Sequence, residues 1–180
     1  KSSPILEKVI RNLDLNFYFE KAGDIMSSQI LFYPFKFTSN ISTDSLKINM
    51  SFNFILEKNG MLVTNLEDGN EYLFPKFSTT GVTHDLPFEI TNIIKERYTD
   101  NSYNIFFIPT SDLISSFKKS IIISGVGKNS DMISLNIQNS NTEYSRNILN
   151  EMIYVFNQDG INDRQLIHKR TIDFVNERYV

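Results

Sequence analysis

The chain has 180 residues, which suits one domain that buries roughly 70% of the surface of its unfolded form. Its hydrophobic content of 41% and charged content of 22% are typical of a globular protein. The net charge of −3 argues against a nucleic-acid-binding surface, which needs a basic patch, and the lack of cysteine excludes disulfides and thiolate metal sites.

The first predicted element is a short helix. Ser3 can cap it, and Pro4 fits its first turn because that position needs no N–H partner. Its buried stripe consists of Ile5, Leu6, Val9, Ile10 and Leu13. A half-buried strand follows, since apolar and polar residues alternate at Leu15, Phe17 and Phe19.

The middle of the chain, residues 38–110, is predicted to be rich in β-strands. Apolar and polar residues alternate at Phe52, Phe54 and Leu56, at Leu86, Phe88 and Ile90, and within 104–108. Asn59-Gly60 and Asp68-Gly69 separate further short strands. We expect two-residue hairpin turns there, because both residues of such a turn take positive φ.

The last third mixes both kinds of element. Thr110 or Ser111 can cap a short helix that buries Leu113, Ile114 and Phe117. Strands follow at 121–123 and 133–137, and the second should bury one face and leave the other in water. Local hairpins with peripheral helices predict an α+β fold with a largely antiparallel β-sheet, flanking helices and a long protruding C-terminal helix.

Residues 141–180 read as that long helix. Apolar residues recur at three- and four-residue spacing at Ile148, Leu149, Met152, Val155 and Phe156. Asn141 or Thr142 can cap its first turn. A continuous helix from residue 142 to 179 would run about 57 Å, whereas a compact domain of this size is roughly 40 Å across. We therefore expect the helix to need more chain or a partner.

The second half of this helix carries a predicted self-association face. Its residues recur at spacings of four and three, like the inner positions of a coiled coil, and are Ile161, Gln165, His168, Ile172, Val175 and Tyr179. Ile167 and Phe174 lie off this face. In the alternative, Gly160 breaks the helix and the second half folds back on the sheet, although a glycine inside a helix costs only about 1 kcal/mol relative to alanine.

The sequence offers no convincing catalytic, cofactor-binding or metal-binding residues. The two histidines, His84 and His168, do not have metal-ligand spacing, and we interpret His84 as a surface residue. Asp159 and Asp163 share one helix face and could bind a cation or do acid–base work, but we interpret that face as solvated. Gly125-Val126-Gly127 lacks the remainder of a phosphate-binding loop and is predicted as a turn.

Three stretches carry a resemblance to a known family. They are Ser3-Pro4-Ile5-Leu6-Glu7-Lys8-Val9-Ile10 through Leu13-Asp14-Leu15, then Tyr72-Leu73-Phe74 through Leu86-Pro87-Phe88-Glu89-Ile90, and last Ile133-Ser134-Leu135 followed by residues 148–159, 161–163 and 174–178. Together they span nearly the whole chain. Their order resembles the periplasmic domains of Wzz/Wzc-type polysaccharide co-polymerases, the chain-length determinant and bacterial tyrosine autokinase family, in a Bacteroidetes-like form.

The resemblance implies a single periplasmic α+β domain, residues 1–180, with a β-rich insertion at 38–110 and a long helix at 141–180. Members of this family are anchored by membrane helices on both sides and assemble into rings. Neither membrane helix is present here, nor is the strand expected before Lys1, so we interpret the chain as a piece excised from a longer membrane-anchored protein. It has no Walker-type motif and no tyrosine cluster, so this domain cannot itself be a kinase.

The implied function is a non-catalytic scaffold at the periplasmic face of the bacterial inner membrane. It would control the chain length or export of a surface polysaccharide (O-antigen, capsule or exopolysaccharide) through homo-oligomeric assembly. The polymerase or the glycan would be further partners, and no cofactor is expected.

Two other hypotheses remain open from the sequence. The Phe-rich strands would also suit a carbohydrate-binding or adhesin-like β module, with Tyr72, Tyr98 or Tyr103 contacting the sugar, although the chain has no tryptophan. A small enzyme would need a cleft with converging titratable groups, and Asp159 and Asp163 facing a deep pocket would indicate one.

Overall fold

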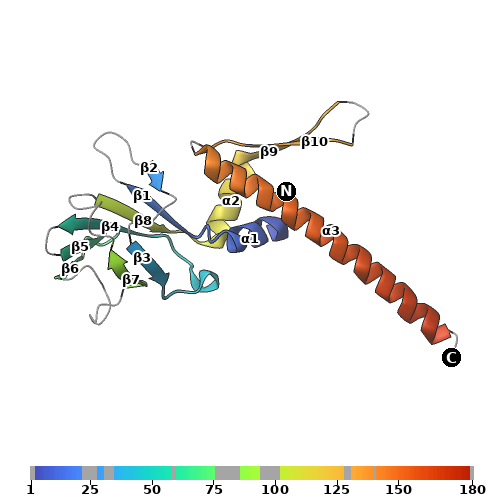
Figure 1. The fold of residues 1–180 in the computed structure, drawn as a ribbon, viewed down its shortest axis with the longest axis horizontal. Coiled ribbons are helices and arrows are strands. Elements are labelled where there is room, and N and C mark those ends of the chain that lie inside the picture. Colours follow the sequence, from blue (N-terminus) through green and yellow to red (C-terminus); the bar gives the residue numbers. More distant parts are fainter. Residues whose placement is uncertain are drawn as a thin grey trace. The chain divides into compact units, whose positions relative to one another are not determined.

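The computed structural model describes residues 3–21, 28–30, 35–57, 60–75, 86–93, 102–127, 131–139 and 141–178. The fold is α+β with antiparallel strand pairs and a long C-terminal helix, as predicted (Figure 1). The chain divides into two compact units, one formed by Lys1–Leu13 with Ile114–Val180 and the other by Asp14–Leu113. The predicted β-rich insertion at 38–110 lies within the second unit.

The described residues of the second unit form two antiparallel sheets. The larger has six strands in the order β2-β1-β8-β4-β5-β6, which are β1 (Phe17–Lys21), β2 (Ser28–Ile30), β4 (Met50–Glu57), β5 (Gly60–Asn65), β6 (Glu71–Phe74) and β8 (Ser102–Phe107). The smaller pairs β3 (Phe35–Ser39) with β7 (Phe88–Ile93). A short 3-10 helix, Thr43–Ser45, lies between β3 and β4.

The core of this unit is an aromatic cluster formed by alternate residues of the strands. The larger sheet contributes Phe19, Phe52, Phe54, Leu56, Tyr103, Ile105 and Phe107, all buried. Phe88 of the smaller sheet packs into their midst, with ring centroids 5.0 Å from Phe52, 5.3 Å from Phe54 and 5.8 Å from Phe107. The alternation predicted for these strands is therefore confirmed, because the odd or even residues of each strand share the buried face.

Neither of the two glycines predicted to lie in two-residue hairpin turns does so. Gly60 belongs to β5 rather than to a turn, and a Cβ there would lie 2.4 Å from the carbonyl oxygen of Phe74. Gly69 does take a positive φ of 76°, but Asp68 does not, so the two-residue turn predicted there is wrong. The connection spans residues 66–70, and its backbone is fixed by the Gly69 N–H, which donates to the Asn65 carbonyl at 2.9 Å.

One polar side chain, Asn16, is completely buried in the second unit. Its Nδ2 donates to the carbonyl oxygen of Ile108 at 2.8 Å and to Oγ1 of Thr110 at 3.1 Å. Its backbone oxygen accepts from the N–H of Ile108 at 2.8 Å. These hydrogen bonds connect the start of β1 to the end of β8, and they are expected because buried polar groups are usually hydrogen-bonded.

Because of Tyr18, we expect the stability of the second unit to fall at alkaline pH. Its ring stacks on Phe106 with centroids 4.6 Å apart, and burial followed by the nearby Glu20 carboxylate raises the pKa of Tyr18 above 10.0. The unfolded chain therefore releases this proton at lower pH than the folded chain, so the stabilisation is complete below pH 10.0 and is lost as pH rises through the folded-state pKa. We expect Tyr18→Phe to lose less stability than the natural chain above this pH, as measured by urea unfolding.

The described residues of the first unit form three helices and an antiparallel strand pair. The unit contains α1 (Ser3–Asn12), the part of α2 (Thr110–Ser120) that follows Leu113, α3 (Thr142–Arg178), and the antiparallel pair β9 (Ile121–Gly125) and β10 (Ile133–Ile137). α1 lies against the first half of α3 (Figure 1). Lys8 forms an ion pair with Asp159, and Asn12 Nδ2 donates to Glu151 Oε1 at 2.7 Å.

The long helix begins where the sequence predicts. Asn141 Oδ1 accepts from the N–H of Tyr144 at 3.0 Å, which is the geometry of an N-cap. Ile148, Met152 and Val155 of the predicted stripe are buried, but Phe156, which was predicted to share it, is exposed. Gly160 does not break α3, which is continuous to Arg178, so the alternative in which the second half folds back is wrong.

The β9–β10 hairpin differs from its prediction. Alternation in β10 indicated one buried face, but Ile133 is 62% exposed and no residue of β10 is buried. Ile122 and Ile123 of β9 are also exposed. The period of a strand tells which residues share a face, but not whether another element covers it.

Candidate functional site

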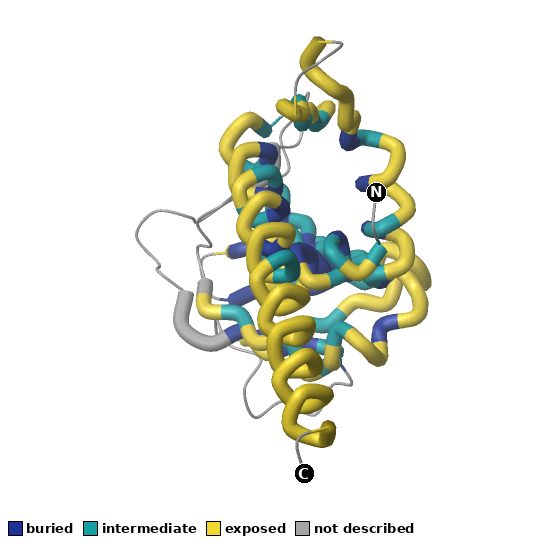
Figure 2. The backbone as a smooth tube through the Cα atoms, turned by 90° about the vertical axis from the view of Figure 1, so that its right-hand side faces the viewer, coloured by how far each residue is buried: buried dark blue, intermediate teal, exposed yellow. Residues whose placement is uncertain are grey.

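The second half of α3 is the most exposed regular element of the described chain. Each residue from 161 to 178 is exposed, which Figure 2 shows as a helix that is yellow toward the C-terminus. Its large apolar side chains share this exposure, and they are Ile161, Leu166, Ile167, Ile172, Phe174 and Val175. A helix of this length with no tertiary packing is marginal in water, because most helix stability in proteins comes from an apolar face that is covered. This surface is the first part of the candidate site.

The predicted self-association residues lie together on one side of this segment. We call this side the Ile161 face, and it consists of Ile161, Gln165, His168, Ile172 and Val175. All five are exposed. Tyr179, the sixth predicted residue, lies outside the described residues.

A second exposed apolar line on α3 was not part of that prediction. Its residues are seven apart and form what we call the Phe174 face, which consists of the exposed Ile153, Ile167 and Phe174 and the half-buried Gly160. Ile167 is 62% exposed and Phe174 is 54% exposed, with the Arg178 guanidinium 4.5 Å above the Phe174 ring. At 3.6 residues per turn, the two faces are about 110° apart around the helix. The heptad spacing was visible in the sequence, but only the structure shows that nothing in the described chain covers it.

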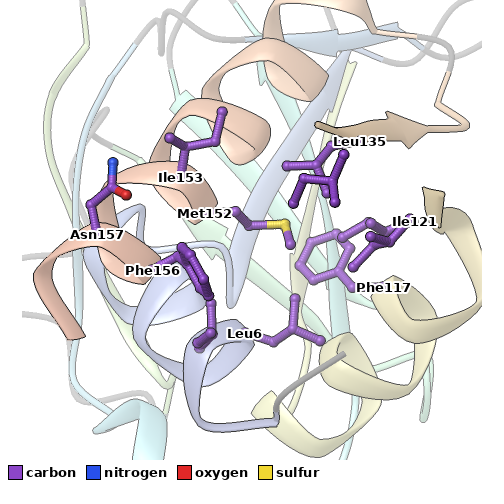
Figure 3. A pocket seen from close by; sticks show the side chains of 11 residues that line it. Leu6, Phe117, Ile121, Leu135, Met152, Ile153, Phe156 and Asn157 are labelled. Carbon is purple, nitrogen blue, oxygen red and sulfur yellow. The ribbon is translucent and has the colours of Figure 1, made fainter. Parts of the chain in front are cut away.

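An apolar groove begins where the Phe174 face meets the rest of the first unit. Its volume is about 470 Å³, and its lining comes from α1, α2, β9, β10 and α3, with the residues Ile5, Leu6, Phe117, Ile121, Ile123, Ile133, Leu135, Met152, Ile153, Phe156 and Asn157. Met152 and Phe117 point toward one another across it, between Leu6 and Leu135 (Figure 3). The volume lies within the roughly 300–1,000 Å³ range of small-molecule sites.

The described lining of this groove is almost entirely apolar. Among the described residues that line it, Asn157 has the only polar side chain, and none is titratable near neutral pH. General acid–base catalysis needs a titratable group within hydrogen-bond reach of the reacting atoms. The described lining of the groove therefore suits contact with a hydrocarbon surface.

The residues considered for catalysis or metal binding do not converge in the described part of the chain. Asp159 is paired with Lys8, Asp163 and His168 are exposed on α3, and neither carboxylate lines the groove. No group of three or more metal-ligating side chains occurs among the described residues. His84 lies outside them.

The second unit has a shallower hollow that bears on the carbohydrate hypothesis. Its volume is about 390 Å³, and it is lined by Asn40, Ile41, Met50, Phe52, Asn65, Tyr72, Leu86 and Pro87. Of the three predicted sugar-contacting tyrosines, only Tyr72 is in this position. Tyr103 is 1% exposed, so its ring has no face available for stacking, and Tyr98 lies outside the described residues.

No helix in the described ranges combines the length with the apolar content that crossing a bilayer requires. Searches of known proteins add no assignment. No model of a known protein family matches the sequence, and no curated protein matches it.

Proposed function

We propose that the chain is a non-catalytic scaffold that works by associating with further copies of itself. The observation that carries this proposal is the exposed second half of α3, with apolar side chains on two faces and no cover within the described chain. Burial of one such side chain contributes about 1.5–3 kcal/mol. The resemblance of the three sequence stretches supports the particular role, control of the chain length or export of a surface polysaccharide at the periplasmic face of the inner membrane.

The association of isolated chains is expected to be weak. The Ile161 face contains polar as well as apolar residues, since Gln165 and His168 lie between Ile161 and Ile172. Anchoring in a membrane would raise the effective concentration of the copies and strengthen the assembly without new contacts. Polymer length would then depend on the geometry of the assembled surface.

Sedimentation equilibrium tests the association itself. We expect the average mass of the natural chain to rise with concentration, whereas a chain with Ile172→Asp should stay closer to the monomer. A natural chain that remains monomeric at every concentration, including when it is anchored in a membrane, would contradict the proposal. For the role in the cell, replacing the natural gene by the Ile172→Asp variant should change the length distribution of the surface polysaccharide. An unchanged distribution would count against that role.

The hollow at Tyr72 favours a second candidate, carbohydrate binding by the second unit. Tyr72 offers a flat ring with a polar hydroxyl, and Asn40 and Asn65 add amide groups that can bond to sugar hydroxyls. Titration with polysaccharide fragments, followed by NMR, would give saturable shifts around Tyr72, and Tyr72→Ala should remove them. Unchanged spectra would exclude this candidate.

A further inference from the structure

Gly160 leaves a gap in the otherwise apolar Phe174 face. A glycine inside a helix is unfavourable relative to alanine. The fold of this chain does not require it, because a Cβ at Gly160 would meet nothing within 4 Å and its φ is not positive. Phe156, which is 62% exposed, lies one helical turn earlier on the same side. A large apolar side chain of another molecule can therefore enter this gap beside the Phe156 ring, since the distance between two packed helices depends on the side chains at the contact.

Phe174 is a side chain that fits this gap, and it lies on the same face. Its ring is 54% exposed, and Ile167 lies midway between it and Gly160, seven residues from each. Two α3 helices that run antiparallel and meet at Ile167 therefore place Phe174 of each copy opposite Gly160 of the other. A parallel pair in register would place like opposite like, so the helices would have to lie far apart at Phe174 and close together at Gly160. Side-chain size therefore favours the antiparallel pair.

The charges beside Ile167 suit the same antiparallel pair. Asp163 and Arg170 border the Phe174 face on one edge, and Arg164 and Thr171 border it on the other. Two-fold antiparallel pairing brings each edge against the same edge of the second copy. Asp163 of each copy then lies beside Arg170 of the other, and Arg164 lies beside the uncharged Thr171. The contact gains two opposite-charge pairs and no like-charge pair next to Ile167.

The charges nearer the end of α3 fit this register as well. Arg178 would lie level with Phe156 of the second copy, where the face is uncharged. Glu177 would lie on the same side as the Lys8–Asp159 ion pair of the second copy, so Lys8 supplies a cation near both carboxylates. The charged residues that border the Phe174 face are therefore all placed without a like-charge pair in direct contact.

We infer that α3 pairs with α3 of a second copy as an antiparallel, two-fold dimer through the Phe174 face. This inference rests on the proposed scaffold function and names one of its contacts. Both copies use the same surface, so the contact is isologous and closes with two chains. The two helices would overlap from Phe156 to Arg178, over about 33 Å. The Ile161 face lies about 110° away around the helix and is not covered by this contact.

Charge reversal in the full chain tests the contact. The reference chain carries Ile172→Asp, which disrupts the Ile161 face so that only the Phe174 face can associate. In sedimentation velocity, we expect it to form a dimer and nothing larger. Adding Asp163→Arg should weaken this dimer at least about tenfold, because both opposite-charge pairs become like-charge pairs. Adding Arg170→Asp as well should restore the dimer to within about threefold of the reference, because the pairs are again opposite in charge.

Asp173→Arg is the matched control for Asp163→Arg. It makes the same change of charge in the same exposed helix segment. Asp173 lies about 120° from the Phe174 face around the helix, so we expect the dimer of the reference chain to keep its strength. An equal loss for both substitutions would show that net charge, rather than the Asp163–Arg170 contact, controls association.

Cysteine cross-linking tests the direction of the two helices, because the natural chain has no cysteine. The antiparallel pair places Arg164 beside Thr171 of the second copy, whereas a parallel pair in register separates them by about 10 Å along the helix axis. Oxidation of an equimolar mixture of Arg164→Cys and Thr171→Cys should therefore give a disulfide-linked dimer, and neither variant alone should do so.

Three results would overturn the inference. They are a reference chain that stays monomeric where the natural chain associates, a double charge reversal that does not restore the dimer, and a cysteine mixture that does not cross-link. In each case the proposed function would stand, because it fails only if the natural chain itself does not associate.

Discussion

Replacing Phe88 by alanine should destabilise the second unit by about 3–5 kcal/mol, the usual cost of removing a buried phenylalanine. Phe88 is 1% exposed, and its ring contacts Phe37, Phe52, Phe54 and Phe107. The space left behind would be lined by rigid rings, which can collapse into it only partly. Denaturant unfolding followed by circular dichroism would measure the loss.

Phe106→Ala is the matched control for Phe88→Ala. Phe106 is only half-buried, and it stacks on Tyr18. Its removal should cost about 1–2 kcal/mol, because the pair is worth roughly 0.5–1.5 kcal/mol beyond its buried area. Equal losses for the two variants would contradict the assignment of Phe88 to the core.

The second large effect is expected at Gly60. A Cβ at this position would lie 2.4 Å from the Phe74 carbonyl oxygen, a backbone atom that cannot move without disturbing the β5–β6 pairing. We expect Gly60→Ala to cost about 3 kcal/mol, the upper end of the range for overpacking. Thermal unfolding of the second unit would report this loss.

Gly160→Ala provides the opposite case. Its Cβ would enter open space in a helix, so at low protein concentration we expect unchanged or higher stability, by up to about 1 kcal/mol. The same chemical change should thus have opposite signs at the two glycines. A destabilising Gly160→Ala would show that the monomer contacts this position.

The elements of the fold were largely predictable because local patterns encode them. Alternation at Phe52 and Phe54 identified a buried strand face, and the spacing of Ile148, Met152 and Val155 identified the packed face of α3. The hairpin turns were less predictable. Asn59-Gly60 has the sequence of a turn, but the glycine is needed because the carbonyl oxygen of Phe74, on the neighbouring strand, lies too close for a Cβ.

The candidate site was only partly predictable. The Ile161 face follows from spacing within one helix, but the groove combines side chains from five elements, which no local pattern brings together. The exposure of Ile133 likewise depends on what lies above β10 rather than on β10 itself. The seven-residue spacing of Ile167 and Phe174 indicated that they share a helix face, but only the structure shows that both side chains are exposed.

We propose that residues 161–178 of α3 are stabilised by a second copy of the chain. Hydrogen exchange of the backbone amides, measured at low and high protein concentration, tests it most directly, because unsupported helices open locally at little cost. We predict fast exchange in 161–178 at low concentration and clear protection at high concentration, with residues 142–160 protected throughout. Equal protection of both segments at every concentration would contradict the claim, because the helix would then need no partner.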